Sequence, residues 1–317
     1  MPMPMPMPMP GADRPAPLPR RGLIKAGLAV TGAAVAATAL TAPAATAAPD
    51  ARARAGQAEL AELERRYGAR LGVYALNART GRTVAHRAGE RFAMCSTFKA
   101  FAAAAVLRDQ GGRAPMDRVL HYPPHDSMAN SPETDKHQAT GMTVADVCAA
   151  AIQYSDNAAG NLLLREIDGP AGLTRFFRSL GDEVSRLDRW EPELNAAVPG
   201  ELLDTTTPQA IASVLERLAL GGALAGADRE RFVGWLKGNT TSGRRFRAGL
   251  PREWVVADKT GTGSYATAND VGVAWTTRQT PVVLAVLSSK TMPDAPVDEA
   301  LIADAASIVA RTLAPGE

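Results

Sequence analysis

The spacing of apolar residues predicts a mixed α/β chain with strands near both of its ends. Helical periodicity covers residues 57–67, with charges on the outer face, and returns at residues 297–313. Residues 71–76 and 82–86 are predicted to be two strands joined by the turn residues 78–81. The chain therefore begins its folded part with a helix and a strand pair, and ends it with a helix.

Further strand patterns occur only late in the chain. They cover residues 254–259, 271–277 and 282–288. The stretch between the two groups of strands, roughly residues 93–235, shows several helical patterns and no convincing run of strands. This order predicts a sheet assembled from both chain ends, with a helical lobe inserted in it. The cleft between the two lobes is the natural place for a site.

The first 47 residues have a different composition from the rest. Residues 1–10 repeat Met-Pro, and no packed core can form from this repeat, because each proline lacks an amide donor and has a fixed φ. We expect a disordered tail there. A charged segment, a short apolar run at 26–40 and the A-x-A site at 45–47 then form the parts of a secretory signal peptide.

The charged segment of this leader contains paired arginines. Arg20 and Arg21, followed by Leu23 and Lys25, resemble a twin-arginine signal read by the export machinery. The apolar run is too short and too weakly apolar to span a bilayer, and no other stretch approaches membrane length. The sequence therefore predicts a secreted protein without a membrane span.

Composition and charge exclude several classes of protein. The chain has 317 residues, of which 46 % are apolar and 21 % charged, as in a soluble globular protein. The net charge of +2 arises in the leader: residues 1–47 hold four basic and one acidic residue, which leaves 31 basic and 32 acidic residues in 48–317. Basic patches with interleaved aromatic residues are absent, so nothing indicates nucleic-acid binding.

A serine and a lysine precede a helical stretch in an arrangement that favours nucleophilic catalysis. Ser96 and Lys99 are three residues apart, so they share one face of a helical turn. A serine hydroxyl is a poor nucleophile until a base takes its proton, and a desolvated lysine one turn away can assist. The S-x-x-K pattern alone is weak, because it also occurs by chance in many helices.

Two more short motifs follow in the chain. Ser155, Asp156 and Asn157 come after the helical run 143–154, where polar residues also commonly end a helix. The segment K-T-G-T-G at 259–263 is expected at the end of the strand 254–258. Its glycines indicate a bulge or a close backbone approach.

Together and in this order, the three motifs are similar to the set found in class A β-lactamases and penicillin-binding proteins. From Glu59 to the C-terminus, the chain resembles a class A serine β-lactamase. A fourth motif, E-x-x-L-N at 191–195, favours the hydrolase over the penicillin-binding proteins. The resemblance implies an Ω-loop closed by an ion pair between Arg189 and Asp204. It also implies an antiparallel sheet flanked by helices, of the β-lactamase/transpeptidase-like fold.

The resemblance implies four catalytic residues. Ser96 would attack the lactam carbonyl, and either Lys99 or Glu191 acting through a water would accept its proton, a choice that the sequence leaves open. Ser155 would relay a proton to the departing lactam nitrogen. Glu191 would then activate the water that opens the acyl-enzyme, with Asn195 helping to hold that water.

The resemblance also implies a set of substrate-binding residues. The backbone N–H groups of Ser96 and Thr262 would form the oxyanion hole. The substrate carboxylate would meet hydroxyl donors and a cation, and Asn157 would bind the acyl-amide side chain. The substrate-binding residues are Asn157, Asn195, Lys259, Thr260, Gly261, Thr262 and Arg245.

The assignment of Arg245 has an alternative. Many relatives have this arginine on the strand after the K-T-G strand, and the corresponding residues here are expected to be Trp275-Thr276-Thr277. A subset of relatives instead uses an arginine in the segment after the helical lobe. The segment around Arg245 resembles that subset, and Arg278 is the competing candidate.

At the cleft rim the family usually has an aromatic residue, whereas this chain has Asn130, which alters the expected substrate contact.

The remaining chemistry is limited. Cys95 and Cys148 lack the partner cysteines found in some relatives, so we expect two free, mostly buried thiols. His121 and His125 have zinc-pair spacing, but two prolines between them prevent the required helix, and no metal or cofactor is expected.

The domains predicted are residues 1–47 as tail and signal peptide and residues 48–317 as a monomeric catalytic domain.

Within that domain, the expected α/β lobe comprises residues 48–92 and 236–317, and the helical lobe residues 93–235. The function predicted is hydrolysis of the β-lactam ring of antibiotics, conferring resistance. Two alternatives remain open: a D,D-peptidase that acts on peptidoglycan, against which Glu191 and Asn195 argue, and a non-catalytic β-lactam sensor, which would need a transmembrane helix and a signalling domain.

Overall fold

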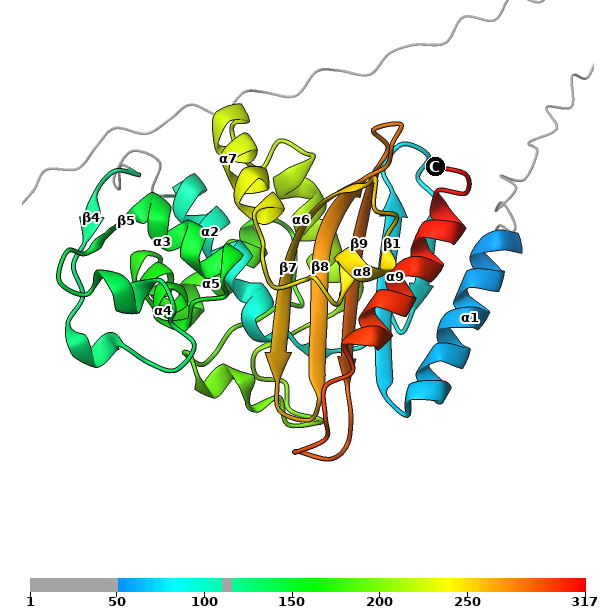
Figure 1. The fold of residues 1–317 in the computed structure, drawn as a ribbon, viewed down its shortest axis with the longest axis horizontal. Coiled ribbons are helices and arrows are strands. Elements are labelled where there is room, and N and C mark those ends of the chain that lie inside the picture. Colours follow the sequence, from blue (N-terminus) through cyan, green and yellow to red (C-terminus); the bar gives the residue numbers. More distant parts are fainter. Residues whose placement is uncertain (1–50, 110–115) are drawn as a thin grey trace, which may run out of the picture. The chain divides into compact units, whose positions relative to one another are not determined.

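The fold is centred on one five-stranded antiparallel sheet with the strand order β2-β1-β9-β8-β7 (Figure 1). The computed structural model describes residues 51–109 and 116–317, so the predicted signal peptide lies outside the described residues. The strands are β1 (Arg70–Asn77), β2 (Thr83–His86), β7 (Val255–Gly263), β8 (Thr267–Trp275) and β9 (Pro281–Ser289).

The two ends of the folded chain meet in this sheet. Strand β1 pairs with β9 over its whole length, from Arg70 opposite Ser289 to Asn77 opposite Val282. The helices that adjoin these strands in sequence, α1 and α9, pack against each other on one face of the sheet (Figure 1). The predicted fold class, a sheet built from both chain ends with helices inserted between, is therefore confirmed.

Nine α-helices are present in residues 51–109 and 116–317, and seven of them lie between β2 and β7 in the chain. They are α1 (Ala51–Tyr67), α2 (Phe98–Asp109), α3 (Val144–Gln153), α4 (Asn157–Glu166), α5 (Gly169–Ser179), α6 (Pro208–Ala219), α7 (Gly226–Lys237), α8 (Phe246–Gly249) and α9 (Glu299–Leu313). Single 3₁₀ turns are η1 (Cys95–Thr97), η2 (Pro124–Asp126), η3 (Thr134–His137) and η4 (Glu193–Ala196). Two-residue strands are β3 (Phe92–Ala93), β4 (Val119–Leu120), β5 (Met142–Thr143) and β6 (Thr205–Thr206).

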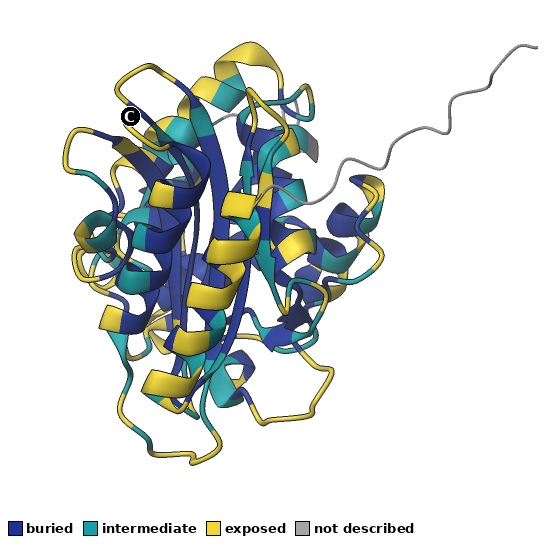
Figure 2. Cartoon of the chain, turned by 90° about the vertical axis from the view of Figure 1, so that its right-hand side faces the viewer, coloured by how far each residue is buried: buried dark blue, intermediate teal, exposed yellow. Residues whose placement is uncertain are grey.

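Alternating side chains of the sheet enter two separate cores. On β9, Val283, Ala285 and Leu287 join the core shared with helices α2–α7, whereas Val282 and Leu284 join the core under α1, α8 and α9. A strand covered on both faces needs a continuous apolar run, which this one has. In Figure 2 the strands are buried, while α1 in front of them is exposed over most of its outer surface.

The predicted elements differ from the observed ones mainly at their ends. Helix α1 begins at residue 51, six residues before the predicted start, and β7 continues to residue 263. The K-T-G segment lies at the end of its strand as expected, but the strand is longer than predicted, because that segment forms the second half of β7. The apolar pattern did not predict this half of the strand, because it consists of polar residues and glycines.

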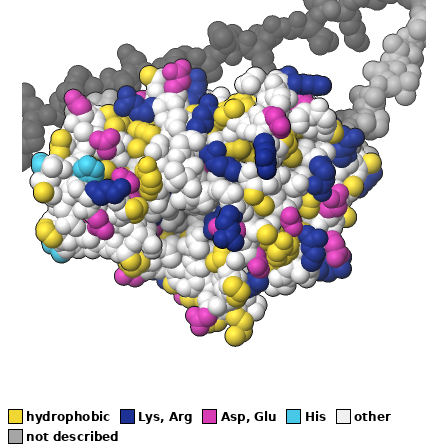
Figure 3. All heavy atoms as spheres, viewed as in Figure 1, with side chains coloured by type: hydrophobic (Ala, Val, Ile, Leu, Met, Phe, Trp, Pro, Cys, Tyr) yellow, Lys and Arg dark blue, Asp and Glu magenta, His cyan; other side chains and the backbone are white. Residues whose placement is uncertain are grey.

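The surface carries both signs of charge. Figure 3 shows Lys and Arg side chains interspersed with Asp and Glu on the face that it presents. Among residues 51–109 and 116–317, no helix is long and apolar enough to cross a membrane.

Strand β7 approaches the turn η1 very closely at Gly261. A Cβ atom added to this glycine would lie 2.9 Å from the carbonyl oxygen of Met94 and 3.2 Å from the backbone nitrogen of Thr97. Both neighbours are backbone atoms, so neither can rotate away. The absence of a side chain at residue 261 therefore sets the distance between β7 and η1.

A cluster of charged side chains fixes α1 to the strand β2. Glu64 accepts hydrogen bonds from Arg87 Nη2 at 2.7 Å and pairs with His86 Nε2. Burial disfavours ionisation of Glu64, but the hydrogen bonds from Arg87 and His86 outweigh it, so its pKa lies below the ordinary value of 4.5. The ionised carboxylate therefore stabilises the docking of α1.

Substitution Gly261→Ala should destabilise the fold, because the new methyl group must push β7 away from η1. We expect the free energy of unfolding, measured by urea titration, to fall by about 1–3 kcal/mol. Gly234→Ala is the matched control, since a Cβ at this exposed helical position meets no atom within 4 Å. Equal stabilities of the two variants would contradict the close approach at residue 261.

Substitution Glu64→Gln should lower stability by about 1 kcal/mol at neutral pH. A depressed carboxyl pKa stabilises the fold above the unfolded value, and this contribution is lost as pH falls through the folded pKa. The stability difference from wild type should therefore shrink below about pH 4.5. Glu62→Gln, at a site whose side chain is 59 % exposed on the same helix, should have little effect at any pH. A pH-independent difference for Glu64→Gln would refute the assignment.

Candidate active site

Ser96 lies in a tight turn that begins helix α2. The turn η1 is closed by a hydrogen bond from Thr97 Oγ1 to the carbonyl of Met94 at 2.7 Å. Cys95 has φ +44°, a left-handed conformation that is unusual for a residue with a side chain and is often found at functional sites. Asn269 on β8 donates to the carbonyls of Ala93 and Met94, which fixes this turn to the sheet.

Lys99 follows on the first turn of α2 and has no exposed surface. Its Nζ lies 3.0 Å from Ser96 Oγ, 2.8 Å from the carbonyl of Ser155, and 2.6 Å from Asn157 Oδ1. It also forms an ion pair with Glu191 Oε1 at 2.9 Å. Burial lowers the pKa of Lys99, while the carboxylate of Glu191 opposes that shift.

The S-D-N motif forms the turn between helices α3 and α4. Asp156 caps the start of α4 by accepting the amide of Ala159 at 2.8 Å, so this residue begins the next helix and does not merely end the preceding one. Ser155 has φ +58°, and its Oγ accepts a hydrogen bond from Lys259 Nζ at 3.0 Å. Asn157 Nδ2 donates to the carbonyl of Ala129, which leaves one N–H of this amide for a ligand.

The segment after α5 returns Glu191 to the nucleophile. Glu191 is 3 % exposed, and its Oε1 accepts from Ser96 Oγ at 3.4 Å. Asn195 Nδ2 donates to Glu191 Oε2 at 2.5 Å. The predicted pair of Arg189 and Asp204 is confirmed, with a separation of 2.5 Å between Nε and Oδ2.

Asn161 is a site residue that the sequence analysis missed. Its Oδ1 accepts the amide of Glu191 at 2.9 Å, and its Nδ2 donates to the carbonyl of Glu191 at 3.0 Å. It therefore holds the backbone of the Ω-loop at the residue that faces Ser96. A signal was available, because Asn161 lies four residues after Asn157 on a largely apolar helix, and this spacing puts both amides on one face.

The K-T-G segment of β7 forms the opposite wall. Lys259 is 1 % exposed, and burial together with the charge of Lys99 lowers its pKa well below the ordinary value. Thr260 Oγ1 lies 2.5 Å from the hydroxyl of Thr241, a second residue that the sequence analysis did not single out.

Arg245, rather than Arg278, reaches this wall. Its Nη2 donates to Thr262 Oγ1 at 2.7 Å, and its Nη1 donates to the carbonyl of Gly261 at 2.8 Å. Arg278 lies in the turn between β8 and β9, where its carbonyl accepts from Arg79.

The prediction that residues 275–277 occupy the position of the strand arginine found in many relatives is wrong. Trp275 pairs with Val255, at the end of β7 remote from the K-T-G segment. The residue that faces Thr262 on β8 is Ala268. A count along the sequence gave the wrong position, since the register of the two strands decides which residues face each other.

Both cysteines are buried and free, as expected. Burial raises the pKa of both thiols, which keeps them protonated. At Gly263 a Cβ would lie 2.7 Å from Cys95 Sγ, so the two residues are close even though only one of them is a cysteine. In the described part of the chain, no group of three or more His, Cys, Asp or Glu residues could hold a metal ion.

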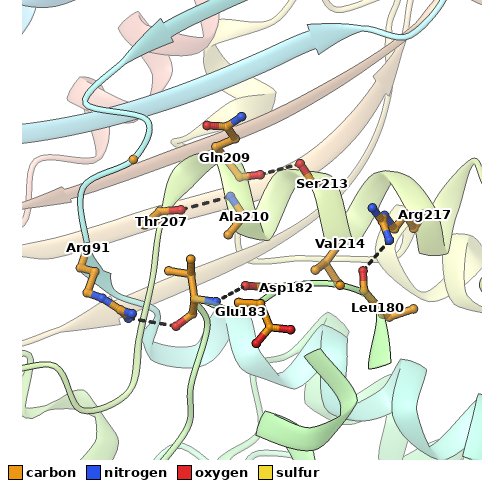
Figure 4. A pocket seen from close by; sticks show the side chains of 13 residues that line it. Arg91, Leu180, Asp182, Glu183, Thr207, Gln209, Ala210, Ser213, Val214 and Arg217 are labelled. Carbon is orange, nitrogen blue, oxygen red and sulfur yellow. Dashed lines mark hydrogen bonds between the residues drawn. The ribbon is translucent and has the colours of Figure 1, made fainter. Parts of the chain in front are cut away.

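A separate cavity of about 540 Å³ lies away from this cluster (Figure 4). Arg91 and Arg217 stand at opposite ends of the view, with Gln209 and Ser213 of α6 between them. None of the predicted site residues lines this cavity. The contacts described above instead connect the eleven predicted residues to one another, with Ser96 and Lys99 between the helices and β7.

Comparison with known proteins agrees with this geometry. The model of the beta-lactamase enzyme family matches residues 56–313. The beta-lactamase of Streptomyces albus G is 53 % identical over 261 residues, covering 80 % of this chain and 83 % of the relative. Its solved structure superimposes with a TM-score of 0.80 and covers 82 % of this chain and 99 % of its own.

Two further relatives are similarly close. The carbapenem-hydrolyzing beta-lactamase KPC of Klebsiella oxytoca is 51 % identical over 255 residues, covering 80 % of this chain and 87 % of the relative. The structure of the last common ancestor of Gram-negative bacteria class A beta-lactamase is 52 % identical, with a TM-score of 0.78, covering 80 % of this chain and 98 % of its own. The chain therefore belongs to the beta-lactamase enzyme family and is a class A serine β-lactamase.

Proposed function

We propose that this enzyme opens the β-lactam ring of antibiotics through a covalent acyl-Ser96 intermediate, which a water activated by Glu191 then hydrolyses, and that it confers β-lactam resistance. The observation that carries the proposal is the position of Glu191. This buried carboxylate lies 3.4 Å from Ser96 Oγ and is held by Asn195 and by Asn161. Without a base at this position, an acylated serine would persist.

In the first step, Ser96 Oγ attacks the lactam carbonyl carbon and loses its proton. Two acceptors are within reach, Glu191 Oε1 and Lys99 Nζ. As an ammonium ion, Lys99 has no lone pair, so Glu191 is then the acceptor. Burial favours loss of a proton from Lys99, which would make its amine the acceptor. The negative oxygen of the tetrahedral intermediate would bind the N–H groups of Ser96 and Thr262.

The lactam C–N bond then breaks, and its nitrogen needs a proton. Ser155 Oγ is suited to supply it, because Lys259 donates to the same oxygen and favours the transfer. The nearby carbonyl of Ser155 accepts from Lys99, which holds the turn in place. The proton taken from Ser96 then passes by way of Lys99 to Ser155 Oγ, which restores the Ser155 hydroxyl and leaves Glu191 ionised. In the last step a water attacks the ester carbonyl, and Glu191 takes its proton. The bond from the carbonyl carbon to Ser96 Oγ breaks, and Glu191 returns the proton to Ser96.

The remaining side chains would bind the substrate. The carboxylate of the drug would meet the hydroxyls of Thr260 and Thr262 and the cation Lys259, with Arg245 behind Thr262 at 2.7 Å. The free N–H of Asn157 would bind the carbonyl of the acyl-amide side chain. Asn130 at the rim is exposed and offers no aromatic face to the substrate.

Substitution Glu191→Ala should stall the second half of the reaction. We expect deacylation to slow by about 100- to 10,000-fold, the usual contribution of a general base, and acylation to be slow or absent. When a penicillin acylates this variant, intact mass spectrometry should show the protein heavier by the whole substrate, because the opened ring remains attached. Glu193→Ala, an exposed carboxylate in the same loop, is the control and should turn over normally.

The wild-type enzyme provides the other arm of this experiment. Complete turnover of a chromogenic cephalosporin is the expected result. One stoichiometric burst followed by no further reaction would instead identify a penicillin-binding protein. Full turnover by Glu191→Ala would disprove the role of Glu191.

We also propose that the enzyme is exported through its leader, whose paired arginines favour the twin-arginine route. Replacement of both Arg20 and Arg21 by Lys should leave most β-lactamase activity inside the cells of a host that has this route. Arg14→Lys, in the same leader but outside the motif, should be exported normally. Unchanged export of the double variant would contradict the route proposed.

A further inference from the structure

Two carboxyl groups that the reaction steps do not use lie beneath the K-T-G segment. Asp258 on β7 and Asp270 on β8 are both 0 % exposed. Asp258 directly precedes Lys259, and Asp270 pairs across the sheet with Thr260. Asp258 and Thr260 are two residues apart on β7, so their side chains point to the same face of the sheet, and Asp270 opposite Thr260 points to that face as well. Both carboxyl groups therefore lie on one side of the sheet.

The hydrogen-bond partners of the two groups are unequal. Asp258 Oδ1 accepts from Arg247 at 3.1 Å, and its Oδ2 accepts from Asn239 at 2.9 Å. Asp270 Oδ2 accepts the amide of Phe246 at 3.2 Å, its one donor within residues 51–109 and 116–317. Asp270 Oδ1 is buried without a donor among the described residues. An ionised carboxylate only accepts hydrogen bonds, so an ionised Asp270 would leave this oxygen unsatisfied at considerable cost.

A single proton resolves this problem. If Asp270 carries a hydrogen on Oδ1, that oxygen becomes a donor to the carboxylate of Asp258. Burial raises the pKa of both groups, and for Asp270 the neighbouring Asp258 raises it further. The donors of Arg247 and Asn239 favour the charge on Asp258, which leaves the proton on Asp270.

Several charged groups face this pair. Arg245 and Arg247 approach from the residues around α8, Lys259 is next to Asp258 on β7, and Lys99 acts on Lys259 from α2. Glu299 of α9 lies on the far side of Arg245, 3.4 Å from its Nε. Burial and Lys99 both favour loss of a proton from Lys259, whereas negative charge on the two aspartates opposes that loss. Asp258 and Lys259 are neighbours on β7, so the pair lies on the opposite face of the strand from the Lys259 side chain.

We propose that Asp258 and Asp270 are positioning residues that share one proton, and that the single negative charge which they hold keeps Lys259 an ammonium ion under the conditions of turnover. Lys259 would then remain a cation for the substrate carboxylate and a donor to Ser155. The inference rests on the proposed function, because it assigns these two groups a role in the reaction proposed for the cleft.

The test compares the variant Asp270→Asn with the double variant Asp258→Asn/Asp270→Asn. In the single variant, a neutral amide replaces a neutral acid, and Asp258 retains the charge. The double variant has no charge at the pair. The measurement is the pH profile of kcat/KM with an anionic penicillin.

We expect the basic limb of the single variant to stay at the wild-type pH. The limb of the double variant should move to lower pH by about one to three units, because Lys259 has lost its counter-charge. A shift of similar size in the single variant would show that the wild-type pair holds two charges. An unmoved limb in the double variant would show that the pair has only a structural role. Either result overturns the proposal.

A second measurement does not depend on turnover or on the folding of the double variant. Infrared spectra in D₂O at neutral pD should contain the carbonyl stretch of a protonated carboxylic acid in the wild type and lack it in Asp270→Asn. Absence of this band from the wild type would overturn the shared proton. If the band is present but the wild type does not hydrolyse β-lactams, the proposed function fails and the shared proton stands.

Discussion

The cleft depends on a lysine that has no access to solvent. Lys99 contacts Ser96 on its own turn, Ser155 and Asn157 at the start of α4, and Glu191 in the Ω-loop. A buried ammonium ion is tolerated only where its donors are satisfied, because an unpaired charge in the interior is very costly. These three distant segments therefore have to converge on one atom, and their convergence brings the reacting groups together.

The sheet supplies the second constraint. The inner strand β9 is apolar on both faces over most of its length, which anchors it between two cores, whereas β7 lies at the edge with polar residues in its second half. An edge strand has no strand partner on one side, so its backbone can face another element. Here that element is η1, and Gly261 allows the two to approach closely. The rigid core thus holds a polar strand next to the nucleophile.

The positive charges in this cleft are balanced partly by carboxyl groups that take no part in the reaction steps. Lys99 is paired with Glu191, whereas Lys259 has no carboxylate in direct contact in the part of the chain that the structure describes, and it depends on the pair Asp258 and Asp270 behind it. Arg245 bonds to backbone carbonyls and to Thr262, and Glu299 lies nearby. The cations of the cleft therefore require buried carboxyl groups behind them, which apolar cores alone would not provide.

Local sequence determined much of this protein. The continuous apolar run of residues 282–288 identified a buried strand, because a strand covered on both faces needs apolar side chains at every position. The spacing of Ser96 and Lys99 placed both on one helical turn, because the period of 3.6 residues is a property of the backbone itself. Sequence did not determine the partners that arrive from elsewhere in the chain. Asn161 holding Glu191, Thr241 beside Thr260, and the register that puts Ala268 rather than Trp275 opposite Thr262 were decided by the tertiary structure. Such contacts join residues far apart in sequence, and only the packing of the whole chain fixes which of them meet.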